Sequence, residues 1–318
     1  MRVRLSFMVA LAVALFASSS ARAQGGESDL ERAAALISGN RLAEAEQQLN
    51  SILKTRPNDA LALNLLGTVR AQQGRLEEAE ALFTRAVRAD ARFVGARMNL
   101  AHLYTIKRET SKAVAQFTEV LKLDPSNPGA AYRLARLYYA EGMLDECVRV
   151  AEAARRAGAL SPPLAVVLGD AYLKKGDAGR AEESYLRALG TDADNADALL
   201  GVASVAQAKN DLKTAALYLA RARDLVGDSP ESLYSYALVA LKTGLYEDAR
   251  LALERASALR PDEAAYSVAL GAVWLKKADL FEAERVFRRA LAVRADGPQA
   301  QMYLGYTLLK QKKYAEAR

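Results

Sequence analysis

The feature of this sequence that most constrains its fold is an internal repeat of fixed period, which runs without an insertion from residue 26 to residue 318. The repeats begin at residues 26, 60, 94, 128, 162, 196, 230, 264 and 298. The eighth position of every repeat is Gly or Ala, and the twentieth is Ala in every repeat except the fourth, which has Cys147. A fixed period of roughly 20 to 50 residues indicates stacked supersecondary units that bury a continuous core. The repeat therefore predicts one extended array rather than separate globular domains.

The residues within each repeat predict two antiparallel helices in close contact. Two helices approach closely where one presents a residue with almost no side chain and large residues fill the space on either side. Large side chains accordingly recur at positions 7, 11 and 24, as in Leu100, Tyr104 and Phe117. Position 15, between the helices, holds residues that favour the left-handed conformation at a helix end. These residues are Gly74, Gly142, Gly176, Gly244, Asn40 and Asn210.

Proline marks the boundaries of the predicted helices. Three repeats place a capping Asn or Ser before a proline at the first helical position. These pairs are Asn127-Pro128, Ser161-Pro162 and Ser229-Pro230. Proline at position 32 ends the second helix, because it lacks the amide hydrogen and clashes with the preceding turn. The prolines at this position are Pro57, Pro125 and Pro261.

This pattern resembles the tetratricopeptide repeat family. The residues that stand where its consensus has Leu-Gly, Tyr, Ala, Phe and Ala are Leu270, Gly271, Trp274, Ala283, Phe287 and Ala290. The resemblance covers residues 26–318 and departs at the usually aromatic position 11, which holds Arg70, Ala206 and Ala240. It implies an all-α fold in which helix pairs stack into a right-handed superhelical solenoid. The first helix of each repeat would then line a concave groove that holds other proteins or peptides.

Residues 1–23 differ from the rest of the chain and are typical of a signal peptide. A basic start is followed by an apolar run from Leu5 to Ala17. This run is too short to span a membrane, since a spanning helix needs about 20 residues. Ala21 and Ala23 flank Arg22 in the pattern that signal peptidase accepts, which predicts cleavage after Ala23. The expected mature chain, residues 24–318, is thus exported to the periplasm or the extracellular space, without a membrane span.

Composition and motifs argue against catalysis, cofactors and nucleic acid. The net charge of +6 falls to about +3 without the arginines of the signal peptide, which offers no electrostatic attraction for nucleic acid. With one histidine, His102, and one cysteine, Cys147, neither a multi-histidine metal site nor an internal disulfide is possible. We find no phosphate-binding Gly motif, zinc-protease motif or nucleophile elbow. We therefore expect no enzyme activity and no cofactor, and we assign Cys147 to core packing.

The predicted groove offers two candidate binding regions, in line with the positions that face the groove in the family. Repeats 3 and 4 present a mixture of Tyr and Arg that is typical of binding hot spots: Asn99, His102, Tyr132, Arg133, Arg136 and Tyr139. His102 faces either the groove or a lightly packed surface, and the sequence does not choose. The later repeats present an apolar set suited to an extended or helical apolar segment: Tyr234, Leu238, Leu241, Leu275, Met302, Tyr306 and Leu309.

Two other patterns along the groove receive structural interpretations. Lysine recurs at position 13, in Lys174, Lys242, Lys276 and Lys310. It either forms a basic stripe along the groove or offsets the dipole at the end of the first helix, and we favour the dipole. The family's carboxylate clamp is matched at only two of its five positions, Asn99 and Arg133. We therefore do not expect that clamp.

The leading hypothesis is an exported scaffold for protein binding in envelope assembly, secretion or polysaccharide export. The chain stops at Arg318, where the second helix of the ninth repeat is expected to begin. This predicts a truncated sequence in which Leu304 and Leu308 lack their covering helix. One alternative is that the repeats recruit substrates or partners for a larger enzyme, a glycosyltransferase or protease, with its catalytic domain beyond residue 318. A further alternative is self-association through the uncovered end.

Overall fold

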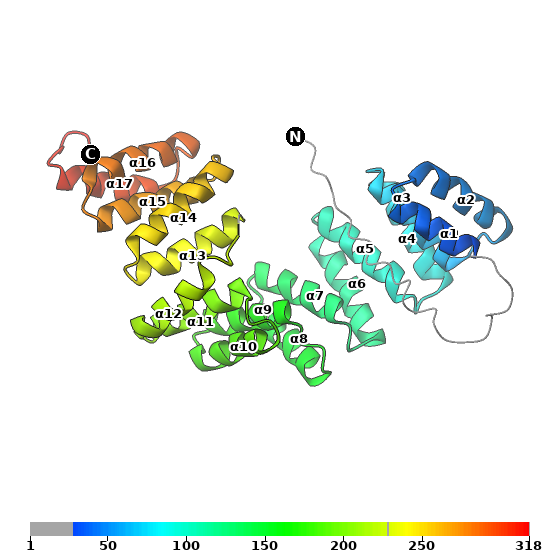
Figure 1. The fold of residues 1–318 in the computed structure, drawn as a ribbon. Coiled ribbons are helices and arrows are strands. Elements are labelled where there is room, and N and C mark those ends of the chain that lie inside the picture. Colours follow the sequence, from blue (N-terminus) through cyan, green and yellow to red (C-terminus); the bar gives the residue numbers. More distant parts are fainter. Residues whose placement is uncertain (1–27, 228, 318) are drawn as a thin grey trace. The chain divides into compact units, whose positions relative to one another are not determined.

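The computed structural model describes residues 28–227 and 229–317, and every regular element within them is an α-helix. The predicted signal peptide lies outside these residues. The helices follow one another in antiparallel pairs (Figure 1), which confirms the predicted all-α solenoid of helix pairs. Their bounds are α1 Asp29–Ser38, α2 Leu42–Thr55, α3 Ala60–Gln72, α4 Leu76–Ala89, α5 Val94–Ile106, α6 Thr110–Leu123, α7 Pro128–Ala140, α8 Leu144–Arg156, α9 Pro162–Lys174, α10 Ala178–Thr191, α11 Ala196–Ala208, α12 Leu212–Ala222, α13 Pro230–Lys242, α14 Tyr246–Leu259, α15 Ala264–Lys276, α16 Leu280–Val293 and α17 Pro298–Lys310.

The odd-numbered helices open the repeats and are called A helices here, and the even-numbered ones are called B helices. As predicted, α7, α9 and α13 begin at proline. Asn127 caps α7 by accepting a hydrogen bond from the amide of Ala130 at 2.9 Å, and Ser229 caps α13 in the same way. The capping prediction is wrong for Ser161, which precedes α9 in extended conformation without a side-chain cap bond. The proline at the first helical position is enough to start that helix, because its φ is already helical.

The turn that follows the A helix has the same left-handed residue in all nine repeats. Position 15 takes a positive φ each time: Asn40 (57°), Gly74 (78°), Arg108 (59°), Gly142 (74°), Gly176 (80°), Asn210 (60°), Gly244 (84°), Ala278 (59°) and Lys312 (64°). Glycine and asparagine tolerate this left-handed conformation, whereas other residues are strained by about 1–2 kcal/mol. The packing of the helix pair thus imposes the turn even on Arg108, Ala278 and Lys312.

The small-residue columns allow the close helix contact that the sequence predicted. The ring of Tyr185 on α10 packs against two glycines, Gly169 on α9 and Gly201 on α11. A methyl group on either glycine would lie only 2.6 Å or 2.4 Å from that ring. Cys147 on α8 is completely buried, in agreement with its assignment to the core, and burial together with the charge of Asp170 raises the pKa of its thiol to about 12.

At the departure from the family pattern in the second repeat, an arginine replaces the usual aromatic side chain in the core. Arg70 on α3 is 9% exposed. Its guanidinium donates to Glu46 on α2 at 2.8 Å and lies 3.1 Å from Glu78 on α4. Hydrogen bonds from Arg70 and Gln73 lower the pKa of Glu46 to about 2. The guanidinium thus links α3 to α2 and α4. These pairs let the arginine be buried, because a buried charge is tolerated only where it is paired.

The chain forms two compact units, and the boundary between them falls within α8. Unit 1 contains α1 to α7 and Arg149–Ala159, and unit 2 contains Leu144–Val148 and the chain from Leu160 onward. In unit 2 the last A helix, α17, packs on α15 and α16. Leu308 on α17 is 2% exposed and Leu304 is half-buried. As predicted, no further helix covers them within the described residues, but the packing of α17 on α15 and α16 already buries Leu308 and part of Leu304.

Candidate functional site

The Tyr- and Arg-rich candidate region lies on unit 1, on neighbouring A helices. Tyr132, Arg136 and Tyr139 project from α7 at spacings of four and three residues, which share one helix face, and Arg133 lies three residues before Arg136 at the edge of that face. Arg133 and Arg136 are exposed, and the two tyrosines are half-buried. The guanidinium of Arg136 stacks 5.6 Å from the ring centre of Tyr132 and donates to its hydroxyl oxygen at 3.3 Å. This contact fixes the positions of the Arg136 cation and the Tyr132 ring at the surface.

Asn99 on α5 belongs to the same region but is already engaged. Its Nδ2 donates to Oδ1 of Asn64 on α3 at 2.9 Å, and Asn64 is only 7% exposed. The bond joins the A helices of two successive repeats. Asn99 is therefore half-buried and helps to order the surface that it was predicted to line.

His102 on α5 is half-buried. Its ring meets the buried ring of Phe117 edge-on, with the centres 6.0 Å apart. Its Nε2 is buried, with no hydrogen-bond partner among the described residues. Burial, with a further contribution from the positive charge of Arg133, lowers the pKa of His102 to about 4. The imidazole is thus neutral at pH 7, and its ring packs against the core beside Phe117.

The apolar candidate region lies on unit 2, on α13, α15 and α17. Tyr234, Leu238 and Leu241 of α13 are half-buried and pack against the core of the unit. The ring of Tyr234 lies 5.1 Å from that of Tyr266 on α15. Leu275 on α15 is also half-buried. The helices α13, α15 and α17 pack side by side.

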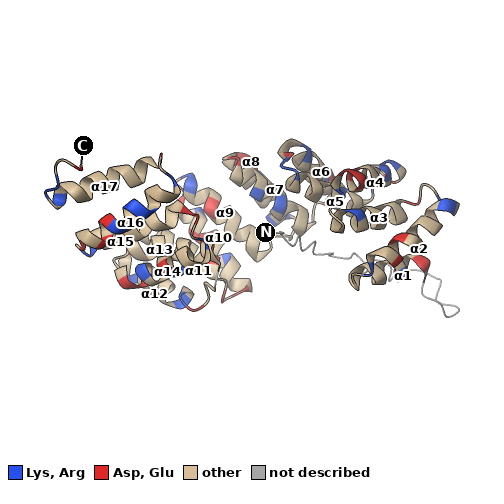
Figure 2. Cartoon of the chain, turned by 90° about the horizontal axis from the view of Figure 1, so that it is seen from above, with Lys and Arg blue, Asp and Glu red and all other residues tan. Residues whose placement is uncertain are grey.

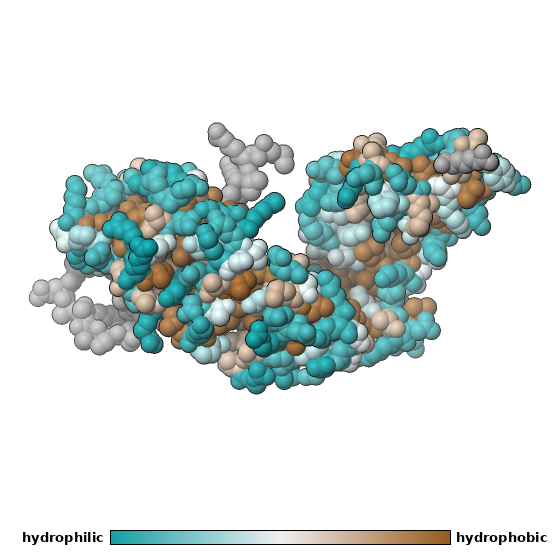
Figure 3. All heavy atoms as spheres, turned by 180° about the vertical axis from the view of Figure 1, so that it is seen from behind, coloured by the Kyte–Doolittle hydropathy of each residue, from teal (hydrophilic) through white to brown (hydrophobic). Residues whose placement is uncertain are grey.

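On α17 the corresponding side chains are much more open. Met302, Tyr306 and Leu309 are 60%, 49% and 52% exposed. Apart from Lys310 this helix carries no charge, and it is tan along most of its length in Figure 2. Figure 3 shows that apolar side chains also reach the surface elsewhere, in patches between hydrophilic residues. The apolar region therefore runs from a half-buried strip on α13 to an exposed strip on α17.

The lysines of position 13 lie where the sequence placed them, in the last turn of their A helices. There they face the negative end of the helix dipole. Lys242, Lys276 and Lys310 are exposed, and they form no salt bridge with another residue in 28–227 or 229–317. The ammonium group of Lys310 lies 5.4 Å from the ring centre of Tyr306. The dipole interpretation and a basic stripe beside the apolar region are thus compatible.

Sequence reasoning missed one acidic group in this part of the fold. Asp170 on α9 occupies the same repeat position as His102 and Arg136. It accepts a hydrogen bond from the hydroxyl of Tyr185 at 2.6 Å, and burial raises the pKa of its carboxyl. The shared position could have indicated it, but only the structure shows that the carboxyl is tied to the core.

Within the described ranges no group of three or more His, Cys, Asp or Glu side chains is arranged to hold a metal ion. None of the helices in those ranges combines the length and the apolar character that crossing a membrane requires.

The paired helices, the recurring turn geometry and the buried small residues define an α-solenoid scaffold. Family models described as tetratricopeptide repeat match residues 30–92, 106–165, 166–230, 234–284 and 275–318. The chain therefore belongs to the tetratricopeptide repeat family, as its sequence pattern predicted. Scaffolds of this family bind proteins or peptides, and they are generally not catalytic.

Among curated proteins, the chain is similar to cellulose synthase operon protein C of Xanthomonas axonopodis pv. citri (strain 306). The two are 28% identical over 186 residues, which cover 58% of this chain and 10% of the relative. The chain thus matches about a tenth of that relative's length.

Solved structures with the same fold include the Cut9–Hcn1 hetero-tetramer of APC/C, with a TM-score of 0.62, 19% identity, and coverage of 88% of this chain and 55% of that one. Pseudomonas aeruginosa pilF gives a TM-score of 0.53 at 19% identity, over 67% of this chain and 96% of that one. At these identities the likeness concerns the fold alone.

Proposed function

We propose that this protein is an exported, non-catalytic scaffold that binds partner proteins or peptides on the A-helix faces of its repeats. The observation that carries the proposal is the exposed pair of Arg136 and Tyr132 with the neighbouring Arg133. Tyrosine and arginine dominate the energetics of protein interfaces. Here Arg136 and Tyr132 hold each other in place, so less side-chain entropy is lost on binding.

The setting that we propose is the cell envelope, in assembly, secretion or polysaccharide export. The predicted signal peptide of residues 1–23 supports export. The similarity to a cellulose synthase operon protein supports polysaccharide export in particular, although it concerns a tenth of that protein. Mass spectrometry of the exported chain tests the first step, and the expected N-terminal residue is Gln24. An intact N-terminus on the exported chain would contradict cleavage after Ala23.

The binding surface can be tested by site-specific photo-crosslinking in cells. A photoreactive phenylalanine analogue at position 139, on the A-helix face, is expected to give discrete partner adducts. The same analogue at Arg149, exposed on the B helix α8, is the matched control and is expected to give none. Arg136→Ala in the first variant should remove the adducts and leave the helical circular dichroism unchanged. Equal adducts at both positions would contradict an A-helix binding face.

A further inference from the structure

The apolar region of unit 2 is bordered by a row of positive charges that form no ion pair within the described ranges. Lys242, Lys276 and Lys310 are the last residues of α13, α15 and α17. Since these A helices pack side by side, the three lysines line one edge of the same surface. All three are exposed.

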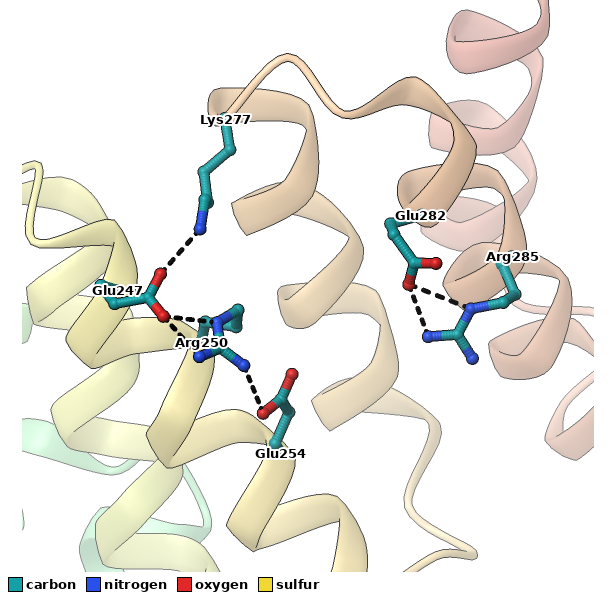
Figure 4. A network of polar contacts seen from close by, with 6 residues as sticks. All are labelled: Glu247, Arg250, Glu254, Lys277, Glu282 and Arg285. Carbon is teal, nitrogen blue, oxygen red and sulfur yellow. Dashed lines mark hydrogen bonds and ion pairs between the residues drawn. The ribbon is translucent and has the colours of Figure 1, made fainter.

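Carboxylates on the neighbouring B helices α14 and α16 are paired with other cations. Figure 4 shows that Glu247 is bound by Lys277 at 2.7 Å and by Nε of Arg250 at 2.9 Å. Arg250 also binds Glu254 at 2.6 Å. On the next B helix, Glu282 pairs with Arg285 at 2.6 Å (Figure 4). Among the described residues, Glu247, Glu254 and Glu282 are thus engaged by other cations, and the lysine row, which forms no ion pair of its own, can offer its charge to a ligand.

Apolar residues lie close to the lysines of the row along each of the three helices. Leu241, Leu275 and Leu309 each precede a lysine of the row by one residue. Leu238 and Tyr306 lie four residues before Lys242 and Lys310, on the same helix face. The surface therefore combines an apolar strip with a positive border along one side.

The spacing of the row selects a ligand conformation. Packed helices lie about 8–10 Å apart, so successive lysines are separated by about that distance. A helix rises about 1.5 Å per residue, so seven residues span about 10 Å and return to the same face. A ligand helix lying across the A helices could thus bring one carboxylate to each lysine at every seventh residue.

We propose that this surface of unit 2 binds an amphipathic helical segment of a partner protein, with an apolar stripe bordered by carboxylates at a spacing of about seven residues. This rests on the proposed function, and it specifies the chemistry of the partner. The apolar stripe lies on α13, α15 and α17, and the carboxylates pair with Lys242, Lys276 and Lys310.

Three fluorescein-labelled peptides, each three heptads long, test the proposal with the full chain. They share the same leucine stripe and differ at one bordering position per heptad, which is Glu, Gln or Lys. Fluorescence anisotropy at low salt should show the Glu peptide binding at least about tenfold more tightly than the Lys peptide, because each of three exposed ion pairs contributes roughly twofold and each lysine–lysine repulsion costs a similar factor. The difference should shrink as salt is added.

Charge-reversal variants identify the residues responsible. Lys242→Glu, Lys276→Glu and Lys310→Glu together should reverse the preference between the Glu and Lys peptides. The control changes the net charge equally, with Arg149→Glu, Lys213→Glu and Arg289→Glu on the B helices, and should preserve it. These three control side chains are also exposed.

Three results would overturn the proposal. Equal binding of all three peptides would remove the charge selection and leave the broader peptide-binding function standing. No binding of any peptide, with the adducts at position 139 intact, would confine the binding function to unit 1. Concentration-dependent dimers that disappear in the lysine variant would identify a second copy of this chain as the occupant.

Discussion

The half-buried imidazole of His102 allows a sharp test of how this surface is packed. In the unfolded chain its pKa is near 6.5, and in the fold it is lowered to about 4 by burial and by the charge of Arg133. Protonation would place a positive charge next to that arginine and against the ring of Phe117. The fold therefore binds a proton less readily than the unfolded chain does.

The magnitude follows from the two pKa values. Because the folded pKa is the lower one, the contribution to stability is fully present above pH 6.5 and is lost as the pH falls through 6.5 toward 4. At pH 5 the two values correspond to a loss of about 2 kcal/mol. His102→Gln should remove this part of the pH dependence, whatever it does to stability at pH 7.

The pKa itself can be measured directly, because His102 is the only histidine in the chain. In protein prepared without a histidine tag, one imidazole signal appears in the NMR spectrum, and its shift against pH should titrate near 4. Arg133→Ala should raise the pKa part of the way toward 6.5, since burial is the larger cause. A wild-type value near 6.5 would refute the packed position of the ring.

Three further substitutions test the packing of the repeats by urea denaturation or thermal melting. Gly271→Ala places a methyl group 2.4 Å from the ring of Phe287 and should destabilise by about 1–3 kcal/mol. Gly190→Ala, where nothing lies within 4 Å, is its control and should be neutral or stabilising. Ala278→Gly relieves a φ of 59° and should stabilise by about 0.5–1 kcal/mol, so a lower melting temperature would contradict the strain. Arg70→Ala leaves Glu46 and Glu78 without their cationic partner and should cost about 1–3 kcal/mol at pH 7. An unchanged unfolding midpoint would mean that these ion pairs contribute nothing to stability.

Much of the fold could be predicted from the sequence, because it depends on local patterns that recur in every repeat. The small columns, the turn residues and the prolines specify where each helix begins, ends and touches its partner. Even the positive φ of Arg108 and Ala278 follows from the register, although neither residue favours that conformation. Neighbouring repeats with Gly or Asn at this position already predict the turn.

The sequence predicted which repeat positions form the candidate surfaces. The charge and hydrogen bonding of the side chains there depend on neighbouring helices. Asn99 bonds to Asn64 of the preceding repeat, and His102 is neutral because its ring is packed beside Arg133. The sequence also allowed two interpretations of the lysines of position 13, a basic stripe along the groove or compensation of the helix dipole. Only the packing of successive repeats shows that, within the described chain, Lys276 lacks an acidic partner while Lys277 has one.

The sequence by itself thus determined the repeat, the helix pairs and the family, since these rest on contacts between residues close in the chain. The tertiary structure decided which side chains remain exposed, charged and unpaired. Those properties depend on the distance between side chains from different repeats, and on how much water their packing excludes. Periodicity in the sequence places such residues on a common face but does not measure either quantity.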